Sequence, residues 1–93
     1  MPRRKCRRNI EFIADVKFYK PQGIPLKELV HVIIDPDELE AIRLADLEGM
    51  YHEDAASSMG VSRQTFGRII GSARRKVADA LIGGKAIQLT VGS

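Results

Sequence analysis

The sequence predicts a mainly α-helical protein with minor β-structure, in which three helices form a helix-turn-helix core between short N- and C-terminal strands. Three observations lead to this fold class. Asp35-Pro36-Asp37-Glu38 has the composition of a helix start. Gly60 ends one helical pattern, and Ser62 is suited to cap the next. After Ser62, the apolar residues recur at helical spacing, which indicates one buried face. These residues are Phe66, Ile69, Ile70, Ala73, Val77, Ala80 and Leu81.

The chain begins with a basic segment. We expect residues 1–9 to form a flexible basic arm, because five of the first eight residues are Arg or Lys. An arm of this kind either contacts phosphates or a minor groove, or serves as a solubilising tail. Residues 10–93 are then expected to form a single helix-turn-helix domain.

Three short strands are expected. Residues 16–19 alternate apolar and polar side chains, and residues 30–34 are rich in β-branched side chains. Residues 86–91 alternate again, which predicts a final edge strand. That strand pairs either with the N-terminal strand or with a partner chain.

The helices are expected at about 36–48, 51–59 and 63–82. In the first, Asp35 is the cap, Pro36 takes the first helical position and Glu38 completes a capping box. Its predicted buried face consists of Leu39, Ile42, Ala45 and Leu47. The glycine pair Gly83-Gly84 ends the third helix.

The turn between the last two helices is the most constrained part of the chain. Glycine at position 60 supplies a positive φ without steric cost, and Ser62 can accept hydrogen bonds from the free amides of the next turn. Ala55 and Ala56 are small enough to let a second helix cross closely. The third helix would therefore be held at a defined angle to the second.

The outer face of the third helix is polar and basic. It carries Arg63, Gln64, Arg68, Arg74, Arg75 and Lys76, with Gly67 and Gly71 between them. Arginine can bind guanine, and glutamine can bind adenine, through two parallel hydrogen bonds in the major groove. The glycines would allow close approach of a DNA backbone, although each costs about 1 kcal/mol of helix stability relative to alanine.

Composition excludes several classes of protein. Apolar residues make up 44%, charged residues 29%, and the mean hydropathy is −0.15, as in a soluble globular protein. No apolar run approaches the roughly 20 residues of a membrane helix. The N-terminus lacks the apolar core of a signal peptide, so we expect a cytoplasmic location. The net charge of +3 is divided into two basic ends and an acidic middle, a distribution that would orient the protein on a duplex.

Neither metal nor enzyme chemistry is indicated. Cys6 is the only cysteine, so no intrachain disulfide can form, and we interpret it as a reduced bystander thiol. With only His31 and His52 besides, we expect no metal and no cofactor. These histidines have no nucleophile or paired acid at a catalytic spacing, so we expect packing or surface roles and no enzyme activity.

Several motifs together resemble a family of small, uncharacterised prokaryotic proteins regarded as DNA-binding, and the likeness covers nearly the whole chain. The motifs are Cys6-Arg7-Arg8, Lys20 to Pro25, Asp37 to Leu44, Gly60 to Phe66 and Ala73 to Leu81. The helix-turn-helix is similar to region 4 of sigma-70-type factors, which reads promoter DNA with the second helix of the motif. The resemblance implies that Ser62, Arg63, Gln64, Thr65 and Arg68 face DNA, and that Arg74 and Arg75 contact phosphates. Tyr51 departs from the pattern, which usually has a serine or threonine cap there.

The function expected from these features is sequence-specific binding of double-stranded DNA, as a transcriptional regulator. A homodimer is expected, because one recognition helix with a few phosphate contacts seldom exceeds non-specific affinity. A protein-interaction module is the alternative, in which the acidic first helix docks on a partner such as the transcription machinery. RNA binding is disfavoured, because the aromatic residues form no evident stacking platform.

Overall fold

The computed structural model describes residues 15–91, with side chains from 17 to 89. Its elements are β1 (Asp15–Tyr19), a 3-10 turn (Leu26–Glu28), β2 (His31–Ile34), α1 (Pro36–Ile42), a π-helical segment (Arg43–Leu47), α2 (His52–Met59), α3 (Arg63–Gly83) and β3 (Ala86–Val91). The predicted helices and strands therefore all occur, with the first helix divided in two. The basic arm and Cys6 lie outside the described residues.

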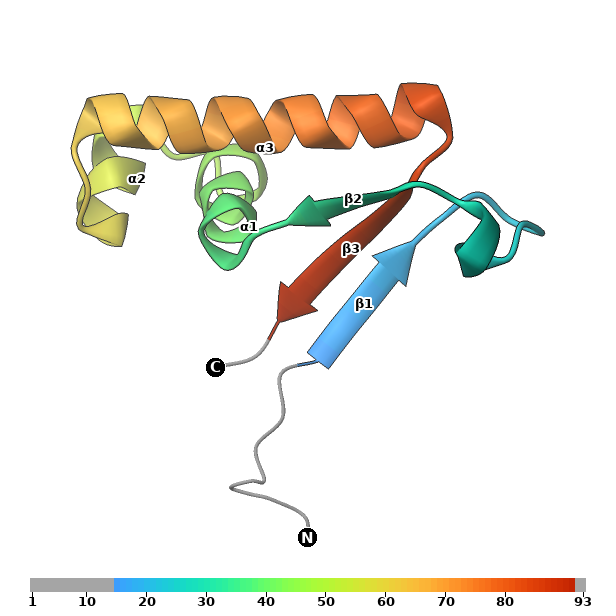
Figure 1. The fold of residues 1–93 in the computed structure, drawn as a ribbon. Helices are drawn as coiled ribbons and strands as arrows, with labels where there is room; N and C mark the ends of the chain where they lie inside the picture. The colour runs from blue at the N-terminus through green and yellow to red at the C-terminus, as the bar shows by residue number, and fades with distance from the viewer. Residues whose placement is uncertain (1–14, 92–93) are drawn as a thin grey trace, which may run out of the picture.

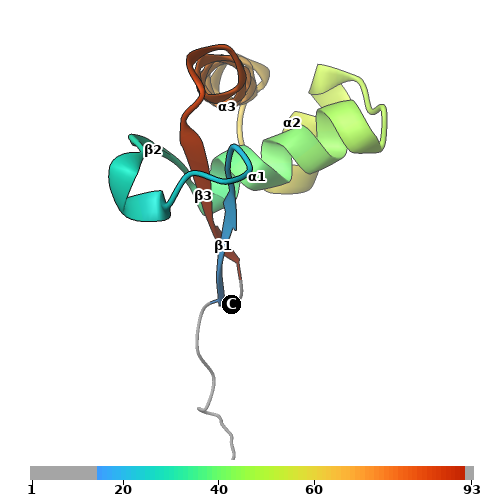
Figure 2. The same ribbon diagram turned by 90° about the vertical axis from the view of Figure 1, so that its right-hand side faces the viewer.

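α3 is the axis around which the other elements are arranged (Figure 1). α1 and α2 lie below its N-terminal half, whereas the sheet lies below its C-terminal half. The view along α3 shows the sheet running down beneath this helix, with α1 also below it and extending to the right (Figure 2). One long helix thus packs against both the other helices and the small sheet.

The core lies where the three helices meet. Ala41, Leu44, Ala55, Ala56, Phe66 and Ile70 form one buried cluster. Alanines at these positions allow the helix backbones to approach, while Phe66, fully buried, fills the space between them. A mainly α fold with minor β-structure and a trihelical helix-turn-helix core is confirmed.

The sheet corrects the prediction of a final edge strand. Its order is β1-β3-β2, with β1 antiparallel and β2 parallel to β3, so the last strand is the central one. The reversal occurs at Gly84, which has φ +66°, and the Ala86 amide then donates to the Val30 carbonyl. Alternation of apolar and polar side chains along a strand indicates which face of the sheet each side chain is on. It does not indicate whether the strand has one neighbouring strand or two.

The first helix also differs from its prediction. After Ile42 the backbone is π-helical, and the Glu48 amide donates to the Arg43 carbonyl at 2.9 Å. The wider turn shifts the register by one residue, because each bond spans five residues instead of four. Leu44 is therefore buried, and Leu47, predicted to be buried, is 77% exposed.

Two predictions about α3 are also wrong. Leu81, assigned to the buried stripe, is 71% exposed, although the adjacent Ala80 is 2% exposed. Lys76, assigned to the outer basic face, instead donates to Glu38 Oε1 at 2.7 Å and to the Ile33 carbonyl at 2.8 Å. Helical spacing defines an angular position, but it does not reveal which neighbours reach that side of the helix.

Candidate nucleic-acid interface

The turn before α3 is fixed by backbone bonds on one side and a side-chain cap on the other. Gly60 has φ +70°, its amide donates to the Ser57 carbonyl, and the Val61 amide donates to the Ala56 carbonyl. This is the paired hydrogen-bond pattern that ends helices at a left-handed glycine. Ser62 Oγ then accepts from the Thr65 amide at 3.0 Å and caps α3 as predicted.

Buried contacts hold α3 against α2. Phe66 is fully buried beside Ala55 and Ala56. The His52 ring meets the Phe66 ring edge to face, with centroids 5.2 Å apart. The predicted packing role of His52 is therefore observed, and the start of α3 is anchored by three contacts from α2.

A row of exposed residues follows the side of α3 opposite its buried stripe. Gln64, Arg68, Gly71 and Arg75 recur at steps of four, three and four, and all four are exposed. At 1.5 Å per residue the row is about 16 Å long. Among the described residues, the ion pairs do not include Arg68 or Arg75. We call these four residues the outer row.

The other predicted residues near the turn lie beside the outer row. Ser62 is exposed, but its hydroxyl is engaged with Thr65, to whose Oγ1 it donates at 3.0 Å. Thr65 is half-buried. Arg63 is exposed on the flank of α3 that faces α2, where it borders a cleft. The sequence correctly predicted that these residues lie together at the start of α3. In the structure, the Ser62 hydroxyl caps the helix and is hydrogen-bonded to the Thr65 hydroxyl.

Arg74 differs from the outer row. Its guanidinium donates to both carboxylate oxygens of Asp46, with Nη2 2.6 Å from Oδ1 and Nε 3.2 Å from Oδ2. These hydrogen bonds raise the pKa of Arg74 and lower the pKa of Asp46 below its ordinary value. The pair joins α3 to the π-helical segment, so Arg74 is directed toward the helical core while Arg75 is not.

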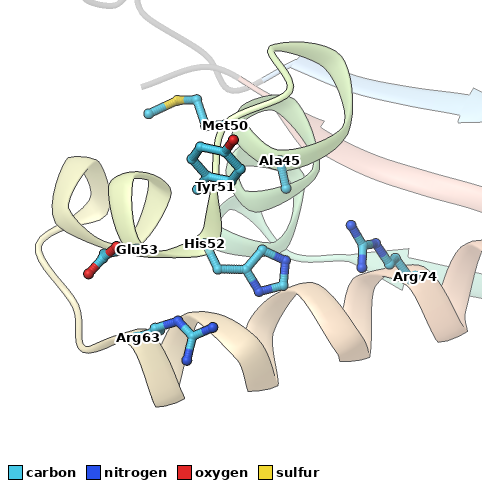
Figure 3. Close-up of a pocket in the computed structure, with 7 residues that line it drawn as sticks. All are labelled: Ala45, Met50, Tyr51, His52, Glu53, Arg63 and Arg74. Atoms are coloured by element: carbon cyan, nitrogen blue, oxygen red, sulfur yellow. The ribbon is translucent and has the colours of Figure 1, made fainter.

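Sequence reasoning did not foresee the cleft between α2 and α3. It has a volume of about 460 Å³ and is lined by Ala45, Met50, Tyr51, His52, Glu53, Arg63 and Arg74. His52 lies between the two arginines in the close-up (Figure 3). Tyr51 is 80% exposed and makes no capping hydrogen bond. In the sequence, the only indication of this cleft was that a tyrosine stands where the motif usually has a serine or threonine cap.

The acidic middle of the chain is largely paired within the molecule. Arg43 forms ion pairs with Glu40 at 2.8 Å and Glu48 at 3.7 Å, and Asp46 is bound by Arg74. Glu38 is buried. Glu53 and Asp54, in the first turn of α2, form no ion pair with another described residue. They complement the helix dipole and oppose a phosphate at that end. Most of the acidic charge near the helical core is therefore compensated by cations of the same chain.

Two further kinds of feature are absent from residues 15–91. They contain no group of three His, Cys, Asp or Glu side chains arranged to hold a metal ion. No helix in this part of the chain has both the length and the hydropathy needed to cross a bilayer.

Comparison with known proteins identifies close relatives. The chain is 59% identical over 85 residues to UPF0251 protein CT0950 of Chlorobaculum tepidum, covering 91% of this chain and 56% of the relative. A UPF0251 protein of Moorella thermoacetica is 54% identical over 92 residues, covering 99% of this chain and 62% of the relative. One from Methanosarcina acetivorans is 48% identical over 91 residues, which is 98% of this chain and 81% of the relative.

The chain is shorter than its relatives, spanning less than two thirds of the length of the first two. No solved structure matches it. A family model described as "Protein of unknown function DUF134" matches residues 1–93. On this match and the identities above, the chain belongs to the DUF134 family of UPF0251 proteins.

Proposed function

We propose that this protein binds double-stranded DNA in a sequence-specific manner and regulates transcription. The observation that carries the proposal is the outer row of Gln64, Arg68, Gly71 and Arg75 on a capped helix. Its length of about 16 Å fits within one passage of a helix through the major groove. The resemblance to sigma region 4 supports the same use of α3, without implying polymerase binding.

The residues of the row have separate roles in this proposal. Gln64 and Arg68, nearer the start of α3, reach base edges, where glutamine selects adenine and arginine selects guanine. Arg75, farther along, contacts phosphate. Gly71 exposes the helix backbone between them, and a Cβ added there would meet nothing within 4 Å. Arg63 supports the row from its flank.

The alternative of docking through the acidic first helix receives less support. Glu38 is buried, Glu40 is paired with Arg43, and Asp46 is paired with Arg74. An acid already paired within the molecule presents little net charge to a partner, because the neighbouring cation cancels most of its field. We also propose a cytoplasmic protein without enzyme activity or cofactor.

Fluorescence anisotropy tests the DNA proposal. The protein is titrated against the duplex upstream of its own gene and against a scrambled duplex, each at several salt concentrations. We expect tighter binding to the natural duplex at physiological salt. Arg68→Ala should remove most of that preference, at a cost of roughly 1 to 3 kcal/mol on the natural duplex alone.

Arg43→Ala is the matched control, because it removes a guanidinium from the π-helical segment, away from the outer row. It should leave the preference intact. Equal binding of the two duplexes by the native protein, or equal losses for Arg68→Ala and Arg43→Ala, would contradict sequence-specific reading by α3.

A further inference from the structure

The cleft between α2 and α3 has an arginine at each end, and the two arginines are in different states (Figure 3). At one end, the guanidinium of Arg74 is bound by Asp46 through two hydrogen bonds, so its charge is largely compensated. At the other end, Arg63 and Glu53 both line the cleft. Among the described residues, the ion pairs include neither of these two side chains. This end of the cleft therefore presents a positive and a negative side chain that are not bound to each other.

Apolar side chains contribute much of the remaining lining. They are Ala45, Met50 and the ring of Tyr51. Tyr51 is the N-cap residue of α2, but its side chain makes no capping hydrogen bond and is 80% exposed. An aromatic ring that neither caps a helix nor fills the core provides a contact surface for a ligand. A volume of about 460 Å³, apolar walls and a few charged groups are typical of small-molecule sites.

The charges at the Arg63 end restrict the class of ligand. A simple anion would be attracted by Arg63 and repelled by Glu53, and a simple cation would experience the reverse. An uncharged ligand would displace water from both side chains without replacing the hydrogen bonds of that water, which costs free energy. A ligand that carries both a carboxylate and an ammonium group would satisfy both side chains.

We propose that this cleft binds a free α-amino acid with an apolar side chain. The carboxylate of the ligand accepts hydrogen bonds from the Arg63 guanidinium, and its ammonium group donates to the Glu53 carboxylate. Its side chain packs against Met50 and Tyr51. The proposal goes beyond DNA binding and does not depend on it, because none of the four residues of the outer row lines the cleft.

A titration of the ¹⁵N-labelled full chain, followed by NMR without DNA, tests the site. L-Phenylalanine and L-leucine represent the proposed class, phenylacetate lacks the ammonium group, and phenethylamine lacks the carboxylate. We expect at least one of the two amino acids to shift the amide signals of residues 50–53 and 63. L-Phenylalanine should bind about tenfold tighter than phenylacetate or phenethylamine, because each of these leaves one charged side chain unpaired. Glycine, which has both charges but no side chain, should bind about tenfold more weakly than L-phenylalanine.

Two variants assign the polar contacts. Arg63→Ala should weaken the binding of L-phenylalanine about tenfold but should not weaken that of phenethylamine, which has no carboxylate. Glu53→Gln should weaken the binding of L-phenylalanine to a similar extent but should not weaken that of phenylacetate. Arg43→Ala and Asp54→Asn are the matched controls, because they remove the same kinds of charge from residues that do not line the cleft. Circular dichroism verifies the folding of each variant.

Several results would overturn the proposal. One is the absence of shifts with both amino acids, and another is equal affinity for L-phenylalanine, phenylacetate and phenethylamine. Phenylacetate that binds as tightly as L-phenylalanine would identify a simple anion site instead. Equal losses for Glu53→Gln and Asp54→Asn would show that Glu53 makes no specific contact with the ammonium group.

Discussion

Arg74 and Arg75 are adjacent in sequence and chemically identical, yet they occupy different environments. Arg74 is bound to Asp46 by two hydrogen bonds, whereas Arg75 is exposed on the outer row. The Arg74–Asp46 pair is about half exposed on both sides. Such a pair is worth at most about 1 kcal/mol, so its main effect is to orient the Arg74 guanidinium toward the helical core.

We therefore predict that Arg75→Ala mainly affects DNA binding, whereas Arg74→Ala mainly affects stability. Arg75→Ala should weaken binding to specific and random duplexes alike. It should also reduce the salt slope, which is the slope of the logarithm of the binding constant against the logarithm of salt concentration, by about one unit, because one phosphate contact is lost. Arg74→Ala should leave the slope nearly unchanged and lower the free energy of unfolding by less than about 1 kcal/mol. Salt titrations by anisotropy and urea denaturation measure the two effects. A larger loss of slope for Arg74→Ala would reverse the assignment.

At the scale of the element, α3 carries glycines where a purely structural helix would be better served by alanine. Gly71 is in the helix interior, it is exposed, and no atom lies within 4 Å of a Cβ built on it. Nothing in the described fold requires glycine there. Gly60 is different, because its φ of +70° is strained for any residue with a Cβ.

Gly71→Ala should consequently stabilise the fold and impair DNA binding. We expect the free energy of unfolding to rise by about 0.5 to 1 kcal/mol, because alanine reduces the entropy of the unfolded chain and favours the helix. Affinity for the natural duplex should fall, because the added methyl group separates the backbone from DNA. Gly60→Ala provides the contrast, with an expected destabilisation of about 1 kcal/mol. Unchanged affinity in a stabilised Gly71→Ala protein would show that the glycine has no part in DNA contact.

At the scale of the whole molecule, one buried carboxylate joins the helical unit to the sheet. Glu38 is 5% exposed and accepts hydrogen bonds from Lys76 Nζ at 2.7 Å, Ser72 Oγ at 2.6 Å and the Asp35 amide at 2.9 Å. Lys76 also donates to the Ile33 carbonyl in β2. The network therefore connects α1, α3 and β2 at the point where they meet.

Removal of the cation should destabilise the protein. Lys76→Ala leaves Glu38 charged and buried, and we expect a loss of about 2 kcal/mol, less than a fully buried pair because Lys76 remains partly exposed. The double variant Glu38→Gln/Lys76→Met removes both charges and should recover most of this loss. Urea denaturation measures each variant. A double variant no more stable than Lys76→Ala alone would argue against an uncompensated charge as the cause.

The same network predicts part of the acid sensitivity. Burial raises the pKa of Glu38, but hydrogen bonds from Lys76, Ser72 and the Asp35 amide lower it more, so the pKa in the folded state lies below the ordinary 4.5. The stabilisation is complete above pH 4.5 and is lost as the pH falls through the folded-state pKa. The stability of Glu38→Gln should therefore depend less steeply on pH below that value, as denaturation at successive pH values would show.

The sequence by itself determined the features that depend on residues close together in the chain. The turn at Gly60, the Ser62 cap, the bounds of α2 and α3 and most of the buried stripe follow from local backbone preferences and helical spacing. The placement of Gln64, Arg68 and Arg75 on one exposed row follows from the same periodicity.

Only the tertiary structure decided which residues from distant parts of the chain meet. In the folded protein, β3 is the central strand of the sheet and Arg74 is bound to Asp46. Lys76 contacts Glu38 and does not lie on the outer face, and Leu81 is exposed. The physical reason is that spacing in sequence gives a side chain its direction on a helix or strand, whereas its partner depends on how the elements pack. Strand order and long-range ion pairs are properties of that packing, and no local pattern encodes them.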